Sequence, residues 1–436
     1  MRNRVFQGFL RTSSVLVSWL LVSSIPVSHV VAQTLSPSDR AENPYRLEEL
    51  IALARGEGLA LRSSKLQAEV SRAGITTARA LPNPEIEWLA GSVRPSQALS
   101  QSGGANNFIL SQRIENPSLR QTRLELAKIG LQSADTATEV LDNNTVAIIK
   151  SRYFELIKRE EELTAAREEL LLTEQIRERV AVRFKTGEGA RFDLLRAETE
   201  VALAEKEVAR ISTRVREARV LLKQAVSAEL PDTYTLQKEN FPALQITDLP
   251  ILLKQAINLN PEIQRSAIEV ARADQRVHFE RASIYPSVSL RLAHDREPDF
   301  QSTRLGIGIS VPFWDKRQGP IAEAKGQAVR ARTDAQLTQF DLEQTITAAW
   351  HQYQAAFASV QTLEGGILER ARNVVKIAEA AYRLGERGIL EYLDTRRQFR
   401  AVQAELISAR LDLQLAITEL ERLTAVPLRN TQGNIK

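Results

Sequence analysis

Cysteine is absent from the 436 residues of this chain, and its absence removes several classes of site. Without a thiol there is no disulfide scaffold, no thiolate metal site, no cysteine nucleophile and no lipid anchored on cysteine. A single methionine leaves little for a soft metal to bind. Aromatic residues make up only 6% of the chain, which is low for a large all-β domain and favours a helix-rich fold.

The chain also lacks a strong excess of either charge. Its 58 lysines and arginines against 54 acids leave a net charge of +4, spread over both signs. Such a mixed field does not indicate a nucleic-acid binder.

Long apolar runs are confined to the N-terminus. Three arginines precede an apolar stretch at 15–31, and no acid occurs before Asp39. This pattern predicts a secretory signal peptide, residues 1–32, cleaved before Gln33. The alternative is an uncleaved anchor helix, which Pro26 and His29 disfavour. Removing residues 1–32 would lower the net charge from +4 to +1, and no later stretch reaches the ~18 apolar residues of a membrane-spanning helix.

Proline is missing from two long segments, residues 118–230 and 321–426. Helix interiors exclude proline because it lacks the N–H and clashes with the preceding turn. Both segments are rich in strong helix formers. Each is interrupted by a glycine turn, FKTGEG at 184–189 and YRLGERG at 382–388. We therefore expect two helical hairpins, 119–186 with 190–229 and 321–384 with 389–423, whose length implies coiled-coil-like pairing.

The two halves match one another in order. The glycine turns align without a gap at an offset of 198, so Gly187 corresponds to Gly385 and Asp193 to Glu391. Shorter helices are expected before each hairpin, near 47–80 and 261–284. A duplication with a period near 200 accounts for this order, although chance similarity of two hairpins is the alternative for the turns alone. The expected organisation is a signal peptide, an N-terminal extension at 33–46, a first repeat at 47–230, a connector at 231–260, a second repeat at 261–425 and a tail at 426–436.

Four short segments alternate between apolar and polar or small residues: 85–90, 107–114, 287–292 and 305–311. Period two with one apolar face is typical of transmembrane β-strands, and a soluble hairpin packed on helices is the alternative. Four strands are too few to close a barrel, and lipid does not tolerate open sheet edges. If these strands cross a membrane, several chains must therefore share one barrel.

This order of elements resembles the TolC family of outer-membrane efflux proteins over about residues 45–425. The segments that carry the resemblance are LPNPE at 81–85, VPFWDKRQG at 311–319, the two glycine turns and LEYLD at 390–394. The first two are most similar to the branch for cobalt-zinc-cadmium and copper-silver resistance. Several members carry an acylated N-terminal cysteine, which this chain lacks, so its anchoring would rest on the barrel.

The resemblance implies a mainly α fold with a small β part, built on a duplicated chain. Three copies would form a 12-stranded transmembrane β-barrel in the outer membrane, continued into the periplasm by a long α-helical barrel. The homotrimer would be a passive exit duct of a tripartite system, with a periplasmic adaptor and an inner-membrane pump, commonly proton-driven, as partners. Heavy-metal cations would be one cargo, and drugs or secreted polypeptides are alternatives.

The resemblance also implies a gate made of acids near the periplasmic tip. Glu391 and Asp394 lie three residues apart in the first turn of the last long helix, on one face, and match the family's tip acids. Asp193 is the counterpart of Glu391 in the first half. Three copies of an acid around one axis would repel each other and attract cations. The alternative role is local, since acids in a first turn favour the positive end of a helix.

The turns themselves would form the tip at which an adaptor docks, in addition to capping the helices. The residues predicted for this tip are Gly187, Gly189, Arg383, Gly385, Arg387 and Gly388.

No metal or cofactor site is expected, because His278, His294 and His351 do not show metal-ligand spacing. No GxSxG, HExxH, P-loop or dinucleotide motif occurs, so we expect no enzyme. The alternative to a channel is a soluble periplasmic coiled-coil scaffold or adaptor whose strands never enter lipid.

Overall fold

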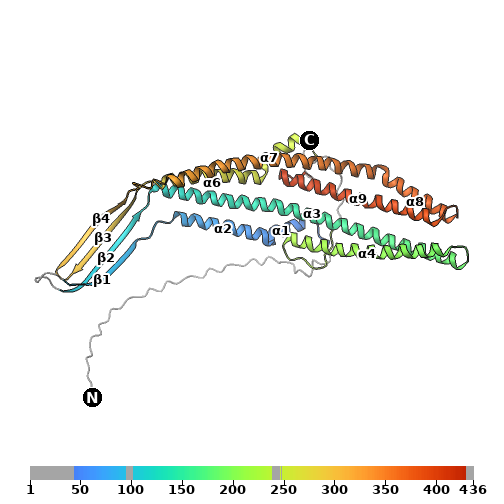
Figure 1. The fold of residues 1–436 in the computed structure, drawn as a ribbon, viewed down its shortest axis with the longest axis horizontal. Coiled ribbons are helices and arrows are strands. Elements are labelled where there is room, and N and C mark those ends of the chain that lie inside the picture. The colour runs from blue at the N-terminus through green and yellow to red at the C-terminus, as the bar shows by residue number, and fades with distance from the viewer. Residues whose placement is uncertain (1–43, 95–101, 238–245, 247, 429–436) are drawn as a thin grey trace, which may run out of the picture. The chain divides into compact units, whose positions relative to one another are not determined.

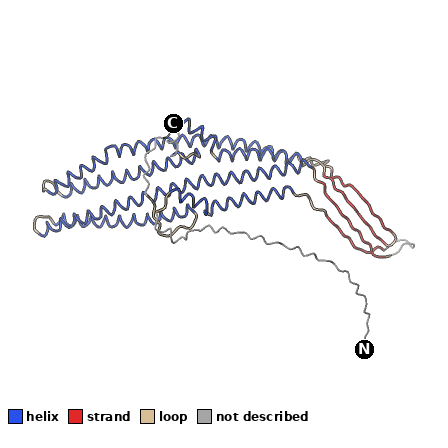
Figure 2. The backbone as a smooth tube through the Cα atoms, turned by 180° about the vertical axis from the view of Figure 1, so that it is seen from behind, coloured by secondary structure: helices blue, strands red, loops and turns tan. Residues whose placement is uncertain are grey.

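Long helices dominate the parts of the chain that the computed structural model describes, residues 44–94, 102–237, 246 and 248–428. The predicted signal peptide, nearly all of the N-terminal extension and the end of the C-terminal tail lie outside the described residues. The strands lie at one end of the long helices and the two glycine turns at the other (Figures 1 and 2).

The described elements repeat in order, as the duplication predicts. In the first half they are α1 (Leu47–Glu57), α2 (Leu59–Arg79), β1 (Glu85–Val93), β2 (Gly103–Ile114), α3 (Pro117–Lys185) and α4 (Arg191–Val226). In the second half they are α5 (Leu249–Leu259), α6 (Pro261–Ala282), β3 (Ser287–Glu297), β4 (Phe300–Ser310), α7 (Gln318–Thr362), a π-helical turn (Leu363–Ile367), α8 (Leu368–Arg383) and α9 (Ile389–Thr424). The helix α5 lies inside the segment expected as a connector.

Matching backbone devices end the matching helices. Both α4 and α9 have 36 residues and stop at a left-handed residue, Ser227 at φ 55° and Ala425 at φ 54°. Both α3 and α6 begin at an Asn-Pro pair. In each, the asparagine Oδ1 accepts from a backbone N–H two residues on, from Ser118 at 2.9 Å and from Glu262 at 2.7 Å.

The second long segment differs from its prediction as a single helix over 321–384. The helix is kinked at Leu363–Ile367, where Gly366 takes a non-helical φ of 155°. Only glycine adopts that backbone conformation without strain. The first hairpin has no such break among its described residues, because α3 runs unbroken for 69 residues. The adjacent pair Gly365 and Gly366 was the sequence signal for this interruption.

The four strands form one antiparallel sheet in the order β1-β2-β3-β4. The predicted strands are confirmed, and all four are longer than the alternation alone suggested. The central pair joins the two repeats, with Leu110 opposite Leu292. Directly opposite residues share a face of the sheet, so this register fixes which side chains lie together.

The helices lie side by side in an order that matches the order of the strands. In the half next to the sheet the order of contact is α2-α3-α6-α7, and in the half next to the glycine turns it is α4-α3-α9-α8. Within the described residues, α2, α4, α7 and α8 are therefore the edge helices of the protomer, as β1 and β4 are the edge strands of the sheet.

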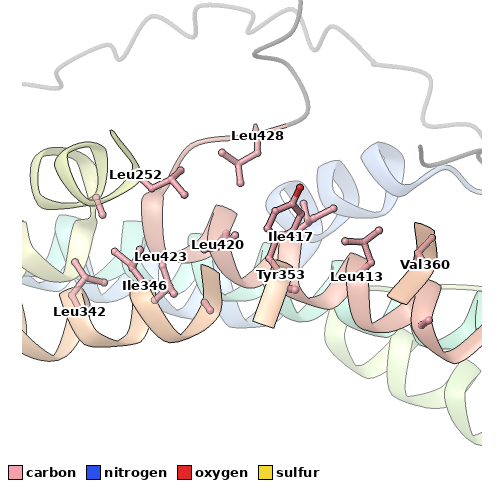
Figure 3. Close-up of a cluster of buried hydrophobic side chains, with 14 of the residues drawn as sticks. Leu252, Leu342, Ile346, Tyr353, Val360, Leu413, Ile417, Leu420, Leu423 and Leu428 are labelled. Carbon is pink, nitrogen blue, oxygen red and sulfur yellow. The ribbon is translucent and has the colours of Figure 1, made fainter. Parts of the chain in front are cut away.

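The largest apolar cluster belongs to the second repeat and lies midway along the helices, between the part next to the sheet and the part next to the glycine turns. Leu252 of α5 packs there with Ile346 and Tyr353 of α7 and with Ile417 and Leu420 of α9 (Figure 3). A corresponding cluster in the first repeat joins α1, α3 and α4. Burying such side chains stabilises the bundle by about 1.5–3 kcal/mol each, so these clusters fix the hairpins at their roots.

Candidate functional site

The two glycine turns have the same hydrogen-bond pattern at an offset of 198. In the first, Gly187 N–H donates to Phe184 O at 3.1 Å and Glu188 N–H to Arg183 O at 2.9 Å. In the second, Gly385 N–H donates to Tyr382 O at 3.1 Å and Glu386 N–H to the Ala381 carbonyl at 3.0 Å. This is the Schellman arrangement, which needs a left-handed residue.

Glycine is required at some turn positions and not at others. Gly187 and Gly385 have φ of 82° and 76°, where a side chain is strained. At Gly189 a Cβ would lie 3.0 Å from the Phe184 nitrogen, whereas at Gly388 it would meet open space. Gly388 is the N-cap of α9, and neither its backbone conformation nor its surroundings exclude a side chain.

The predicted gate acids lie on the exposed side of α9. Glu391 and Asp394 are exposed, while Tyr392 and Leu393 between them are buried. Glu391 pairs with Arg387 one helical turn earlier, and Asp394 lies 3.5 Å from Arg397. The structure thus places both acids together at the start of α9.

The other predicted residues stay within their own hairpins. Asp193 is half-buried in the first turn of α4. It does not take part in the described ion pairs of Glu391 and Asp394 with Arg387 and Arg397. Arg383 pairs with Glu379 of α8 at 2.5 Å. Arg383 and Arg387 therefore make local pairs and leave the exposed turn backbone free.

A set of residues that the sequence analysis did not find joins the two hairpins above the tip. Glu169 of α3, 8% exposed, accepts from Arg396 of α9 and lies 3.5 Å from Arg400. Glu200 of α4, 10% exposed, pairs with Arg397. We call these five residues the inter-hairpin clamp. Arg397 contacts both Glu200 and Asp394, so the clamp is continuous with a predicted gate acid.

Aromatic contacts extend the clamp to the turns. The Tyr382 and Tyr392 rings stack at 5.8 Å with an interplanar angle of 5°. The Arg183 guanidinium of the first hairpin lies over the Tyr382 ring at 5.9 Å. Burial, aided by the nearby Glu379 carboxylate, raises the pKa of Tyr392, so its phenol stays neutral at physiological pH.

The sequence could have suggested only part of this clamp. Three arginines within five positions, 396–400, mark an unusual basic stretch on α9. Their acidic partners lie about two hundred positions away on other helices, and only the fold brings them close.

The sheet carries a continuous apolar face. The register aligns Ile86, Leu110, Leu292 and Leu305 in one row across the four strands. The next row toward the hairpin ends contains Trp88, Phe108, His294 and Thr303, and the one beyond it contains Ala90, Asn106, Arg296 and Gln301. The face therefore changes from apolar through aromatic to polar along the strands.

The opposite face of the sheet is mostly polar or small, with Leu89, Ile109 and Phe300 as exceptions. Asp295 accepts hydrogen bonds there from Asn107 of β2 and from Arg304 of β4, the latter at 2.5 Å. Glycine and serine dominate the rest of this face on β4. A sheet with one apolar and one polar face separates an apolar from an aqueous medium.

No metal-binding group stands out in the described part of the chain. No three histidine, aspartate or glutamate side chains converge there as a metal's ligands would. His294 bonds Thr303 at 2.9 Å, and the His351 ring contacts Trp350. Among the described helices, none combines the length and the apolar composition needed to cross a membrane.

Comparison with known proteins matches both repeats. A family model described as outer membrane efflux protein matches residues 50–228 and 252–426. The cobalt-zinc-cadmium resistance protein CzcC of Cupriavidus metallidurans is 24% identical over 385 residues, covering 88% of this chain and 90% of CzcC.

Two solved structures have the same fold. A membrane protein from Pseudomonas aeruginosa superposes with a TM-score of 0.75 at 17% identity, over 87% of this chain and 90% of that one. A structure of CusC, from work on folding and transmembrane channel formation, gives 0.74 at 17% identity over 87% and 91%.

Proposed function

This chain belongs to the outer membrane efflux protein family, and on that premise we propose that it is the exit duct of a tripartite system that exports heavy-metal cations. The family is one of outer-membrane efflux channels, which decides against the soluble scaffold. The observation that carries the proposal is the sheet with an exposed apolar face and two unpaired edges, continuous with two long helical hairpins.

We propose that three copies complete the duct. Most of the exposed large apolar side chains of the described helices lie on the edge helices of the protomer, where no described element covers them, and a smaller number lie on α3 and other helices. Those of the edge helices are Leu59, Leu66 and Val70 on α2, Phe192, Leu195, Leu203 and Val220 on α4, Val329, Leu337 and Phe340 on α7, and Val374 and Ile377 on α8. A head-to-tail contact would bury one edge of each copy against the opposite edge of the next.

The same contact would pair the open strands. Joining β4 of one copy to β1 of the next extends the sheet without an edge, and three copies give twelve strands. The apolar face would then meet lipid and the polar face would line the bore. The described helices would continue this ring on the periplasmic side.

The gate is proposed at Glu391 and Asp394, with Asp193 as a weaker contributor. In a trimer each acid would occur three times around one axis, and such a ring attracts cations and narrows the passage. Arg387 and Arg397 lie beside these acids and would moderate their repulsion. The clamp would hold the hairpins in the closed arrangement.

The cargo is proposed from the similarity to CzcC, which is named for cobalt, zinc and cadmium resistance. A passive duct needs no resident metal site, and selection would rest with the pump. The partners would be a periplasmic adaptor at the tip, where Gly187, Gly189, Gly385 and Gly388 leave the backbone accessible, and an inner-membrane pump, proton-driven. We assign no catalytic step to this chain.

Single-channel recording in a planar bilayer tests the duct and the gate together. The unmodified protein should give small, cation-selective steps, and the doubly substituted E391A/D394A protein larger ones. E405A is the matched control, because Glu405 is also an exposed acid of α9 but lies about two turns beyond the clamp's Arg397. Steps that do not respond to E391A/D394A would refute the gate alone, and no steps from any protein would refute the duct.

The cargo requires a separate test. A strain lacking the gene should become sensitive to zinc, cobalt and cadmium, and the restored gene should reverse this. Unchanged sensitivity to all three metals, together with normal conductance, would leave the duct and overturn its cargo.

A further inference from the structure

The segment between β4 and α7, residues 311–317, is longer than its counterpart in the first repeat. There, only Glu115 and Asn116 separate β2 from α3, whereas seven residues, VPFWDKR, separate β4 from α7. Two residues are therefore enough to join strand to helix in this architecture. The added residues include two aromatic side chains, Phe313 and Trp314, which the connection itself does not need.

This loop has a fixed shape. Phe313 N–H donates to Val311 O at 3.0 Å, and Arg317 N–H donates to the Asp315 carboxylate at 2.8 Å. The Arg317 guanidinium pairs with Glu280 of α6, whose side chain is 3% exposed. The loop thus has two internal hydrogen bonds, and its last residue is tied to α6.

Nothing in the described protomer covers these rings. Trp314 is 95% exposed and Phe313 is 73% exposed, and their ring centroids lie 6.3 Å apart. A tryptophan has a large apolar ring and a polar N–H, a combination suited to the boundary between water and lipid. Leaving both rings in water would forgo much of the free energy that their burial supplies.

The position of the loop continues the apolar face of the sheet. From Thr303, in the aromatic row with Trp88, to Ser310 the strand β4 rises about 23 Å along its axis. A tilt of about 45° shortens this height, and the loop extends it again toward the helices. Trp88 and Trp314 would therefore lie near the two borders of an apolar band about 25 Å tall.

Lys316 supplies charge at the inner border. It is exposed, it lies two residues after Trp314, and no ion pair is described for it. An ammonium beside aromatic rings at a membrane border complements the phosphate of a lipid headgroup. The adjoining helices lie on this side of the sheet, so the border faces the periplasm (Figure 1).

We propose that residues 311–317 form a lipid anchor, in which Phe313 and Trp314 enter the headgroup region of the periplasmic leaflet and Lys316 binds an anionic phospholipid headgroup. This anchor rests on the proposed placement of the sheet in the outer membrane. It would fix the depth and tilt of the duct in a chain that has no cysteine for acylation.

Tryptophan fluorescence of the full-length protein in vesicles of phosphatidylethanolamine and phosphatidylglycerol tests the anchor. The lipids carry bromine either near the headgroup end or at the end of the acyl chains. Subtracting the spectra of W314F, W88F and W350F isolates each tryptophan. Trp314 emission should be blue-shifted and quenched at least about twofold more by bromine near the headgroups than by bromine at the chain ends. K316E should reduce this quenching.

The other tryptophans separate the failure of the anchor from the failure of the proposed function. Trp350 lies on α7 and should not be quenched, which gives the baseline. If Trp88 is quenched and Trp314 is not, the anchor is refuted and the membrane placement stands. Trp314 would then be covered by a second copy if its emission is blue-shifted, and bathed in water if it is not. If neither is quenched, the membrane placement fails and the anchor with it.

Discussion

Replacing Glu169 by glutamine tests whether the inter-hairpin clamp holds the tip of the duct. Glu169 is the acid that Arg396 and Arg400 of α9 share, and its side chain is 8% exposed. Glutamine keeps the volume and one hydrogen-bond acceptor but removes the charge. The guanidinium of Arg396, itself 16% exposed, would then be left in a crevice without its counter-charge.

The size of the effect follows from this burial. Breaking a fully buried ion pair costs about 3–5 kcal/mol, because one charge remains uncompensated. Arg400 is more exposed than Arg396, and water screens part of the loss, so we expect about 2–3 kcal/mol for E169Q. That corresponds to a roughly 30- to 150-fold increase in local opening of the hairpins.

Hydrogen exchange of the assembled protein measures this opening. Amides of α9 around residues 392–404 should exchange faster in E169Q by that factor, while amides near the core cluster at Ile417 should not change. E69Q is the control, because Glu69 pairs with Arg72 on the exposed surface of α2, away from the clamp, and should contribute at most about 0.5 kcal/mol.

Equal exchange of the α9 amides in E169Q and E69Q would refute the clamp. A double-substitution cycle with R396M excludes a trivial packing defect, because E169Q should cost clearly less when Arg396 is already absent. If the clamp holds the duct closed, E169Q should also show wide conductance states more often, in a protein in which Glu391 and Asp394 are unchanged.

Three further predictions concern the tip and the root of the hairpins. Burial raises the pKa of Tyr392, so its stabilising contribution is complete below the usual phenol pKa of about 10 and is lost as the pH rises through the folded-state value. An ultraviolet titration should show this phenol ionising at a higher pH in the folded protein than in the denatured chain, and ionisation at the same pH in both would contradict its burial. G187A should lower stability by about 1 kcal/mol because of its positive φ, whereas G388A should cost only about 0.5 kcal/mol, because its φ of −76° suits alanine and only the weaker N-cap preference of alanine counts against it, as thermal unfolding would show. N260A should cost about 2 kcal/mol, because the buried amide both caps α6 and donates to the Leu423 carbonyl at 2.8 Å; an undiminished melting temperature would contradict that role.

The hairpins were predictable from the sequence because their rules are local. Missing proline marks the helices, and Gly187 and Gly385 mark the only conformation that can end them in a Schellman turn. Strand alternation predicted the sheet for the same reason. The break at Gly366 was missed, since glycine inside a helical pattern is tolerated and does not by itself require a break.

The clamp was not predictable for a different reason. Glu169 and Arg396 are joined by the way α3 packs on α9, and no periodicity within either helix encodes that packing. The gate acids are an intermediate case: the structure brings Glu391 and Asp394 to one exposed surface, as their spacing predicts, and their role as a gate remains a prediction.

The spacing of the repeats limits how the length of this chain can change over time. Leu47 and Leu249 begin matching helices 202 positions apart, while Arg191 and Ile389 begin matching helices only 198 apart. Only one of these four positions is lost between the start of the strands and the start of α3 or α7, because the shorter β3–β4 hairpin and the longer β4–α7 connection nearly offset each other. The other three are lost in the hairpin arm, where α3 spans 69 residues and its counterpart, residues 318–383, spans 66. Each residue gained or lost in an arm shifts its turn by about 100° and 1.5 Å, and the shorter arm is the one that is interrupted at Gly366. We expect homologous chains to vary most in their strand connections, and to change the length of an arm only where such an interruption absorbs the shift.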